Sequence, residues 1–182
     1  MTQSNLAMKR PEPVVPALGE AFGGGIVGNI TPWAGGRQAI VIVADKTAGG
    51  DLGEFAWDPD YDDAPGAKSF TDGLANTDAI NDGQHPAAQA ARAYRGGGFD
   101  DWQLPALAEH LGLLANLCPI WTEMPAFKTG GEQAYEEAPY WTSTQSQFYQ
   151  LYAWTQHFGS GLSDYWSKGN DYRVRPVRIV LI

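Results

Sequence analysis

The chain has 182 residues, a length that suits one compact domain with a tail better than two full domains. Its hydrophobic fraction of 43% and charged fraction of 18% exclude an intrinsically disordered polymer. The 21 acidic residues outnumber the 12 lysines and arginines, and the net charge of −9 repels phosphate backbones, which excludes a general nucleic-acid-binding protein.

Residues 1–20 are predicted to be a proline-rich N-terminal arm, and residues 21–182 the folded domain. The arm has no apolar stretch of the kind that forms a secretory signal, so we expect a protein made in the cytoplasm. Three prolines favour an extended path: Pro11, Pro13 and Pro16. The arm is either a disordered leader or a segment that docks on another subunit. Because its apolar side chains would otherwise face water, we expect it to be ordered only against another chain.

The rest of the chain reads as an α+β domain. The 22 glycines and 12 prolines predict short strands joined by long loops. The β-branched run over 39–44 is typical of a strand buried on both faces. Two helices are predicted, over 85–94 and 105–117, because each has a proline in its first turn. Further strands are predicted over 140–144, 152–158 and 173–182. No apolar run reaches the roughly 18 residues of a membrane span, so no membrane insertion is expected.

An acidic loop over 51–63 is the one candidate metal site. Asp58, Asp60 and Asp62 alternate in the way that can bring carboxylates together on calcium. The pattern departs from a calcium-binding EF-hand loop, because Asp63 replaces the sixth-position glycine and Ser69 the twelfth-position glutamate. A solvated acidic loop is therefore the default interpretation, and calcium binding is the alternative.

No convincing set of catalytic residues is present. The histidines, His85, His110 and His157, have no metal-ligand spacing, and each is predicted to be a surface or hydrogen-bonded residue. Cys118 is the only cysteine, which excludes an internal disulfide, and its place at a helix end predicts a small buried apolar residue. We expect a protein that is not an enzyme and needs no cofactor.

Four segments resemble the C-type-lectin-like domains that end many phage tail-fibre proteins and collagen-like bacterial adhesins. They are Asp101–Pro105, Tyr140–Thr144, Ala153–Gly161 and Arg173–Arg178. The resemblance covers residues 20–182. It implies a C-type-lectin-like α+β fold, with two helices in the first half and a twisted antiparallel sheet with long loops.

The chain departs from two relatives of this family. Formylglycine-generating enzymes use a pair of cysteines, whereas this chain has one, which argues against that oxidase activity. The calcium motifs of sugar-binding C-type lectins are absent, so calcium-dependent sugar binding is not implied.

Residues 141–178 are also similar to the variable regions of proteins diversified by diversity-generating retroelements, such as the phage major tropism determinant. Independent of that similarity, residues 145–172 contain eight aromatic residues and only three charged ones. Tyrosine and tryptophan supply rigid contact area in antibody paratopes, and small polar residues supply adaptable hydrogen bonds. The candidate ligand-binding residues are Tyr149, Ser163, Asp164, Tyr165, Trp166, Asn170 and Tyr172. We expect the four aromatic members to share one exposed face, and we assign Trp141, Trp154 and Phe158 to the core.

The resemblance implies a tail or tail-fibre protein of a phage virion that binds a host-surface protein or glycan during attachment. Residues 1–20 would join it to other tail or baseplate subunits, and a homo-oligomer, plausibly a trimer, is expected. The alternative is a structural virion protein of the same fold without a receptor. The C-terminal arginines, Arg173, Arg175 and Arg178, are predicted to pair with carboxylates rather than with nucleic acid.

Overall fold

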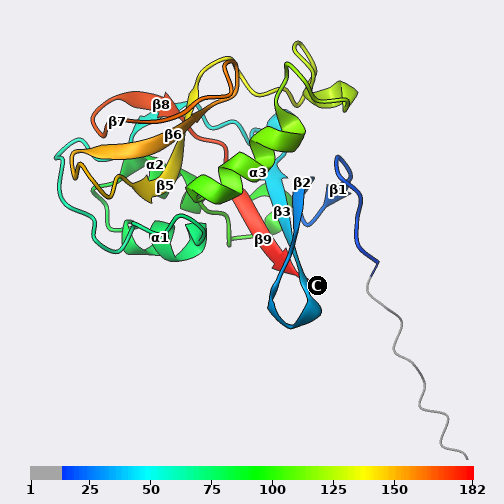
Figure 1. Ribbon diagram of the computed structural model, residues 1–182, viewed down its shortest axis with the longest axis horizontal. Coiled ribbons are helices and arrows are strands. Elements are labelled where there is room, and N and C mark those ends of the chain that lie inside the picture. Colours follow the sequence, from blue (N-terminus) through cyan, green and yellow to red (C-terminus); the bar gives the residue numbers. More distant parts are fainter. Residues whose placement is uncertain (1–13) are drawn as a thin grey trace, which may run out of the picture.

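The computed structural model describes residues 14–182 and shows two curled sheets with helices packed against them (Figure 1). The predicted α+β class with a twisted antiparallel sheet is confirmed. Within residues 14–182, none of the helices has the length and apolarity needed to cross a membrane.

The first sheet has four antiparallel strands in the order β1-β2-β3-β9. Their bounds are Ala21–Phe22 (β1), Gly25–Pro32 (β2), Gln38–Ala44 (β3) and Val177–Leu181 (β9). The predicted burial of β3 on both faces is confirmed, since Ala39 through Ala44 are all buried. Val41 and Val43 belong to one apolar cluster, and Ile40 and Ile42 to another on the opposite face.

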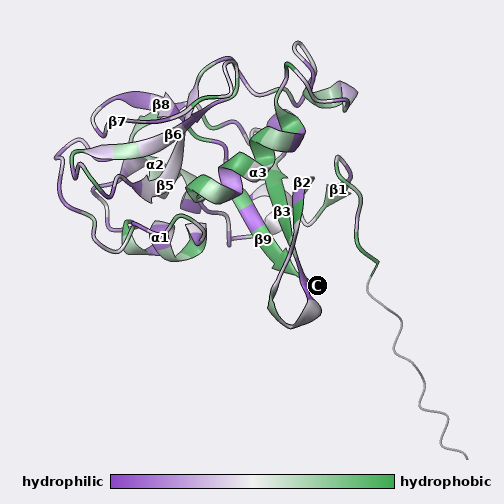
Figure 2. Ribbon diagram, in the orientation of Figure 1, coloured by the Kyte–Doolittle hydropathy of each residue, from purple (hydrophilic) through white to green (hydrophobic). Residues whose placement is uncertain are grey.

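The second sheet has five strands in the order β4-β8-β5-β6-β7. Their bounds are Glu54–Ala56 (β4), Pro139–Gln145 (β5), Tyr152–His157 (β6), Ser163–Ser167 (β7) and Asp171–Arg173 (β8). All pairings are antiparallel except that of β5 with β8. Figure 2 shows this sheet as paler and more hydrophilic than β3, β9 and α3, because its strands are rich in Tyr, Trp, Ser and Thr.

The described residues contain three α-helices rather than the two that the sequence predicts. They are Gly73–Ala79 (α1), Pro86–Ala93 (α2) and Leu107–Leu117 (α3). Short 3-10 turns lie at Ala34–Gly36, Lys46–Ala48, Gly96–Gly98 and Pro125–Phe127. The helix that the sequence analysis did not predict is α1. It begins with glycine and contains Asn, Thr and Asp, which are weak helix formers. The Asp72 carboxylate caps it by accepting a hydrogen bond from the Ala75 N–H at 2.9 Å.

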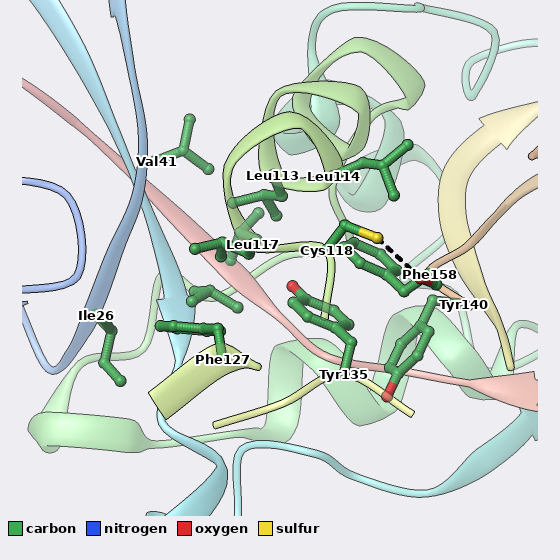
Figure 3. Packing of buried hydrophobic residues seen from close by; sticks show 12 residues of the cluster. Ile26, Val41, Leu113, Leu114, Leu117, Cys118, Phe127, Tyr135, Tyr140 and Phe158 are labelled. Carbon is green, nitrogen blue, oxygen red and sulfur yellow. Dashed lines mark hydrogen bonds between the residues drawn. The ribbon is translucent and has the colours of Figure 1, made fainter. Parts of the chain in front are cut away.

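Helix α3 joins the two sheets through a shared apolar core (Figure 3). It approaches β2 so closely that a Cβ atom at Gly28 would collide with the Leu113 side chain. Cys118 at its end is buried, as predicted, and its Sγ donates to the Phe158 carbonyl at 3.1 Å. Tyr135 stacks on Phe158 with ring centroids 3.6 Å apart.

The described part of the N-terminal arm packs on its own domain. Gly19 N–H donates to the Val27 carbonyl at 2.8 Å, and Val27 N–H donates to the Glu20 carbonyl at 2.9 Å. The prediction that residues 1–20 are ordered only against another chain is therefore wrong for residues 19 and 20, because β2 supplies main-chain partners. Val14, Val15 and Leu18 are exposed, and residues 1–13 lie outside the described residues.

Two of the three C-terminal arginines pair with carboxylates, as predicted. An Arg173 guanidinium nitrogen lies 3.0 Å from Asp51, and Arg178 forms a two-pronged pair with Asp101, with one N–O distance of 2.9 Å. These pairs tie β8 and β9 to loops far away in the sequence.

Arg175 corrects both the predicted carboxylate pairing and the predicted continuous strand over 173–182. The segment leaves one sheet after Arg173 and enters the other at Val177. Arg175, buried in this crossing, donates to the Ala44 carbonyl at 3.0 Å and to the main chain and side chain of Gln133 at 2.7 and 2.8 Å. Neutral acceptors thus satisfy its guanidinium inside the protein.

Candidate recognition surface

The β6–β7 hairpin lies at the edge of the five-stranded sheet and holds most of the candidate ligand-binding residues. Ala153 lies opposite Trp166 and Trp154 opposite Tyr165 in the antiparallel pairing. Successive residues of a strand point to opposite faces, so Tyr165 and Trp166 face opposite sides of the sheet. The prediction that all four candidate aromatic residues share one face is therefore wrong.

One side of the hairpin presents a cluster that we call the aromatic face, formed by Tyr149, Tyr152, Trp154 and Tyr165. The Tyr165 ring centroid lies 5.6 Å from Tyr149, 6.0 Å from Tyr152 and 5.2 Å from Trp154. These separations are typical of interacting aromatic pairs, so the rings support one another and form a rigid surface.

The aromatic face is open to solvent at the loop between β5 and β6. Tyr149 is 53% exposed, and its neighbour Phe148 is 78% exposed. Ser163 lies on the same side of β7 as Tyr165, and its hydroxyl donates to the Gln156 side-chain oxygen at 2.6 Å. Large exposed aromatic side chains grouped in this way are unusual on a protein surface and mark interaction sites.

The opposite side of the hairpin has a small cavity of about 130 Å³, which three of the other four candidates line. Asp164, Trp166 and Tyr172 line the cavity, and Trp166 is 45% exposed. Asn170 donates its side-chain amide to the Tyr172 hydroxyl at 3.1 Å. Tyr172 packs against Trp141 with centroids 4.9 Å apart, so this side rests directly on the core.

Of the three aromatic residues assigned to the core, two are fully buried. Trp141 donates its indole N–H to the Phe55 carbonyl at 2.8 Å, and Phe158 lies in the cluster of Figure 3. Trp154 is only half buried, because its face of β6 is the aromatic face. Its assignment to the core is therefore wrong.

The acidic loop contains a buried ion pair that the sequence reasoning missed. Asp58 is fully buried and lies 3.5 Å from the equally buried ammonium of Lys168. Lys168 also donates to the Gln145 side-chain oxygen at 2.8 Å and lies 4.7 Å from the centre of the Trp57 ring. Burial lowers the pKa of Lys168, and the adjacent Asp58 opposes that shift. An isolated lysine in the sequence gave no sign of this pairing.

The three loop carboxylates do not meet. Asp58 faces Lys168, whereas Asp60 and Asp62 are exposed. Across residues 14–182, no three acidic, histidine or cysteine side chains come together in a way that could hold a metal ion.

Each histidine has a separate setting. His85 Nδ1 lies 2.8 Å from Asp82, and His157 Nδ1 accepts a hydrogen bond from the Gly159 N–H at 3.1 Å. His110 is buried in the core, and neither ring nitrogen has a partner among the described residues. Burial lowers the pKa of His110 to about 3, so this imidazole is neutral at physiological pH.

A family model described as the Lcl C-terminal domain matches residues 52–178. The match covers more than half of the chain and includes the five-stranded sheet, the acidic loop from residue 52 onward and both sides of the β6–β7 hairpin. No curated protein matches the chain.

Proposed function

Because the chain belongs to the Lcl C-terminal domain family, whose domains occur in phage tail and adhesin-type proteins, we propose that it is a phage tail or tail-fibre protein that binds a host-surface receptor. The domain would act by binding rather than catalysis. A host-surface protein or glycan would be its ligand.

The observation that supports this proposal is the aromatic face. Tyr149, Tyr152 and Tyr165 form a contiguous set of rings at the edge of a sheet, with Tyr149 more than half exposed. Tyrosines of this kind bury large area at low entropic cost and offer a hydroxyl to the partner. A glycan ring can stack on them, and a protein loop can pack between them.

The test compares two neighbouring residues of β7 that face opposite ways. Tyr165→Ala should weaken adsorption to host cells by about 1–4 kcal/mol of binding free energy, as expected for an interface hot spot. Trp166→Ala is the matched control and should leave adsorption near the wild-type level. Loss of adsorption in the Trp166 variant alone would place the receptor surface on the opposite side, around Asp164, Asn170 and Tyr172.

A third variant separates binding from folding. Trp141 is fully buried, so Trp141→Ala should lower the free energy of unfolding by about 3–5 kcal/mol through lost burial and a cavity. Thermal melting, measured on all three variants, must show Tyr165→Ala folded for its adsorption to be informative. If the isolated wild-type protein does not adsorb to host cells, while particles that lack it fail to assemble, the protein is a structural tail component without a receptor.

We further propose that residues 1–20 join the domain to tail or baseplate subunits in a virion and that several copies associate, with a trimer as the first expectation. Exposed Val14, Val15 and Leu18 support an attachment role, since they offer apolar surface next to the domain. Light scattering on the full chain and on a variant that lacks residues 1–20 tests this. An unchanged oligomeric state after the deletion would contradict it.

A further inference from the structure

A cavity of about 430 Å³ lies between the four-stranded sheet and helices α1 and α3. One of its walls is a face of the sheet, where Val41 of β3 lies opposite Ile179 of β9. The volume lies within the range of about 300–1,000 Å³ that is usual for small-molecule sites. No residue of the aromatic face lines it, so the cavity is separate from the proposed receptor surface.

Large apolar side chains from three separate elements line the cavity and remain in contact with water. Trp33 follows β2, Leu74 belongs to α1, and Leu181 ends β9. Their exposed fractions are 46%, 45% and 39%. Exposed apolar side chains that gather at a hollow are a feature of binding sites, because a ligand with an apolar body removes them from water.

The polar part of the lining is negative. Among residues 14–182, the charged side chains that line the cavity are those of Asp72 and Glu109. Burial raises the pKa of Glu109 to about 7, and the negative charge of Asp72 adds to this shift. The main-chain N–H groups of Ala106 and Gly73 and the side chain of Gln103 hydrogen-bond Glu109 and oppose it.

This arrangement favours a cation. Burial and the charge of Asp72 both destabilise the ionised form of Glu109, and a positive charge near the two carboxylates offsets both effects. Calcium takes six to eight oxygen ligands, which two carboxylates among apolar walls do not supply. A primary ammonium has a compact charge with three N–H donors, and the hydrocarbon chain behind it can cover the apolar walls.

We propose that this cavity binds a small apolar primary amine in its protonated form. The ammonium lies at the Asp72 and Glu109 carboxylates, and the hydrocarbon chain lies against Val41, Leu74 and Ile179.

Titration of the full chain with hexylammonium, followed by NMR of the main-chain amides, tests the proposal. Saturable shifts are expected at cavity residues such as Leu74, Ala108 and Ile179. Hexan-1-ol, which has the same chain without the charge, should bind at least tenfold more weakly, and hexanoate should not bind detectably. Equal affinity for the three probes, or shifts confined to residues outside the cavity, would overturn the proposal.

Glu109 gives the site a dependence on pH that can be measured. Hexylammonium stays charged between pH 6 and pH 8, whereas a carboxyl with a pKa of about 7 loses its proton over this range. The affinity of the wild-type protein for hexylammonium should therefore rise about fivefold from pH 6 to pH 8. Glu109→Gln does not titrate and should show a constant affinity. A rise of equal size in this variant would contradict the role given to Glu109.

Two further variants locate the site. Asp72→Asn keeps a residue that can cap α1 but removes the charge, so hexylammonium should bind about fivefold more weakly while hexan-1-ol binds as before. Ala108 lines the cavity from the exposed side of α3, so Ala108→Phe should fill it and abolish binding of both probes.

The control for Asp72→Asn is Asp171→Asn, which removes the same charge from an exposed position of β8 in the other sheet and should leave the affinity unchanged. Thermal melting must show that each variant is folded. Wild-type affinity in Asp72→Asn or Ala108→Phe, or an equal loss in Asp171→Asn, would contradict the assignment.

Discussion

At the scale of single residues, His110 shows how a polar side chain can be tolerated rather than used. Neither ring nitrogen has a hydrogen-bond partner among residues 14–182, and the ring packs edge-on against Phe158 with centroids 5.5 Å apart. We expect His110→Leu to raise the free energy of unfolding by about 1–2 kcal/mol, because two unsatisfied groups are replaced by an apolar side chain of similar size.

The gain from His110→Leu should grow on acidification. The folded-state pKa of about 3 lies below the unfolded value of 6.5, so the wild-type protein loses stability as pH falls below 6.5. The advantage of the variant should increase by about 2 kcal/mol between pH 7 and pH 5 in urea unfolding experiments. His157→Leu is the control and should destabilise, since its Nδ1 accepts two main-chain hydrogen bonds in the β6–β7 turn. A destabilised His110→Leu variant would show that this imidazole has a partner.

The burial and the partners of single polar side chains are what the sequence predicts least well. Lysine and arginine side chains are expected at the surface, yet Lys168 and Arg175 are both buried. Their partners, Asp58 and Gln133, are more than 40 positions away, and only the folded chain brings them together. Cys118, in contrast, could be placed from its local context at the end of an apolar helix.

At the scale of elements, Glu109 connects two helices. Its carboxylate accepts from Ala106 at the start of α3 and from Gly73, the first residue of α1. A Cβ at Gly73 would collide with this carboxylate, which explains why glycine opens α1 despite its poor helix propensity.

This connection makes stability depend on pH in the opposite sense to His110. The folded-state pKa of about 7 exceeds the unfolded 4.5, so the protonated form is favoured by folding, and its contribution is lost as pH rises from 4.5 through 7. Relative to Glu109→Gln, which does not titrate, the wild-type protein should lose about 2–3 kcal/mol of unfolding free energy between pH 5 and pH 8. Parallel urea titrations at both pH values measure the difference. A constant difference would mean that Glu109 is solvated.

The positions of the strands along the sequence were easier to predict than the face of the sheet to which each side chain points. The aromatic segments of β5 and β6 are recognisable from composition, but the face of each side chain depends on register. Tyr165 and Trp166 are adjacent in the sequence and both aromatic, and only the pairing with Trp154 and Ala153 assigns them to opposite sides.

At the scale of the whole molecule, the fold class follows from the order of short strands, glycine-rich loops and two helices, and the family from four spaced segments. The division into two sheets does not follow, because it depends on the crossing at Arg175 between β8 and β9. That crossing is stabilised by the hydrogen-bond acceptors that Ala44 and Gln133 offer to Arg175. Composition alone predicts one unbroken strand over 173–182.

The ion pair in the acidic loop leads to a prediction of how the stability of the whole molecule responds to removal of calcium. The Lys168 ammonium lies 3.5 Å from Asp58 and offsets its charge, so we expect the fold to be stable without calcium at this loop. We expect a calcium chelator to change neither the melting temperature nor host adsorption. A melting temperature that falls with chelator and recovers on addition of calcium would contradict this expectation.

If residues 1–20 attach the domain as proposed, the arrangement in Figure 1 separates the attachment segment from the proposed receptor surface. The segment after residue 13 and the C-terminus lie at one end of the long axis, and the β6–β7 hairpin lies at the other. Copies held side by side through their N-terminal segments would turn their hairpins outward together. Several weak contacts can then form at once, so avidity multiplies the strength of each. A modest loss per domain, such as that from one tyrosine, would become a steep loss of attachment for the particle.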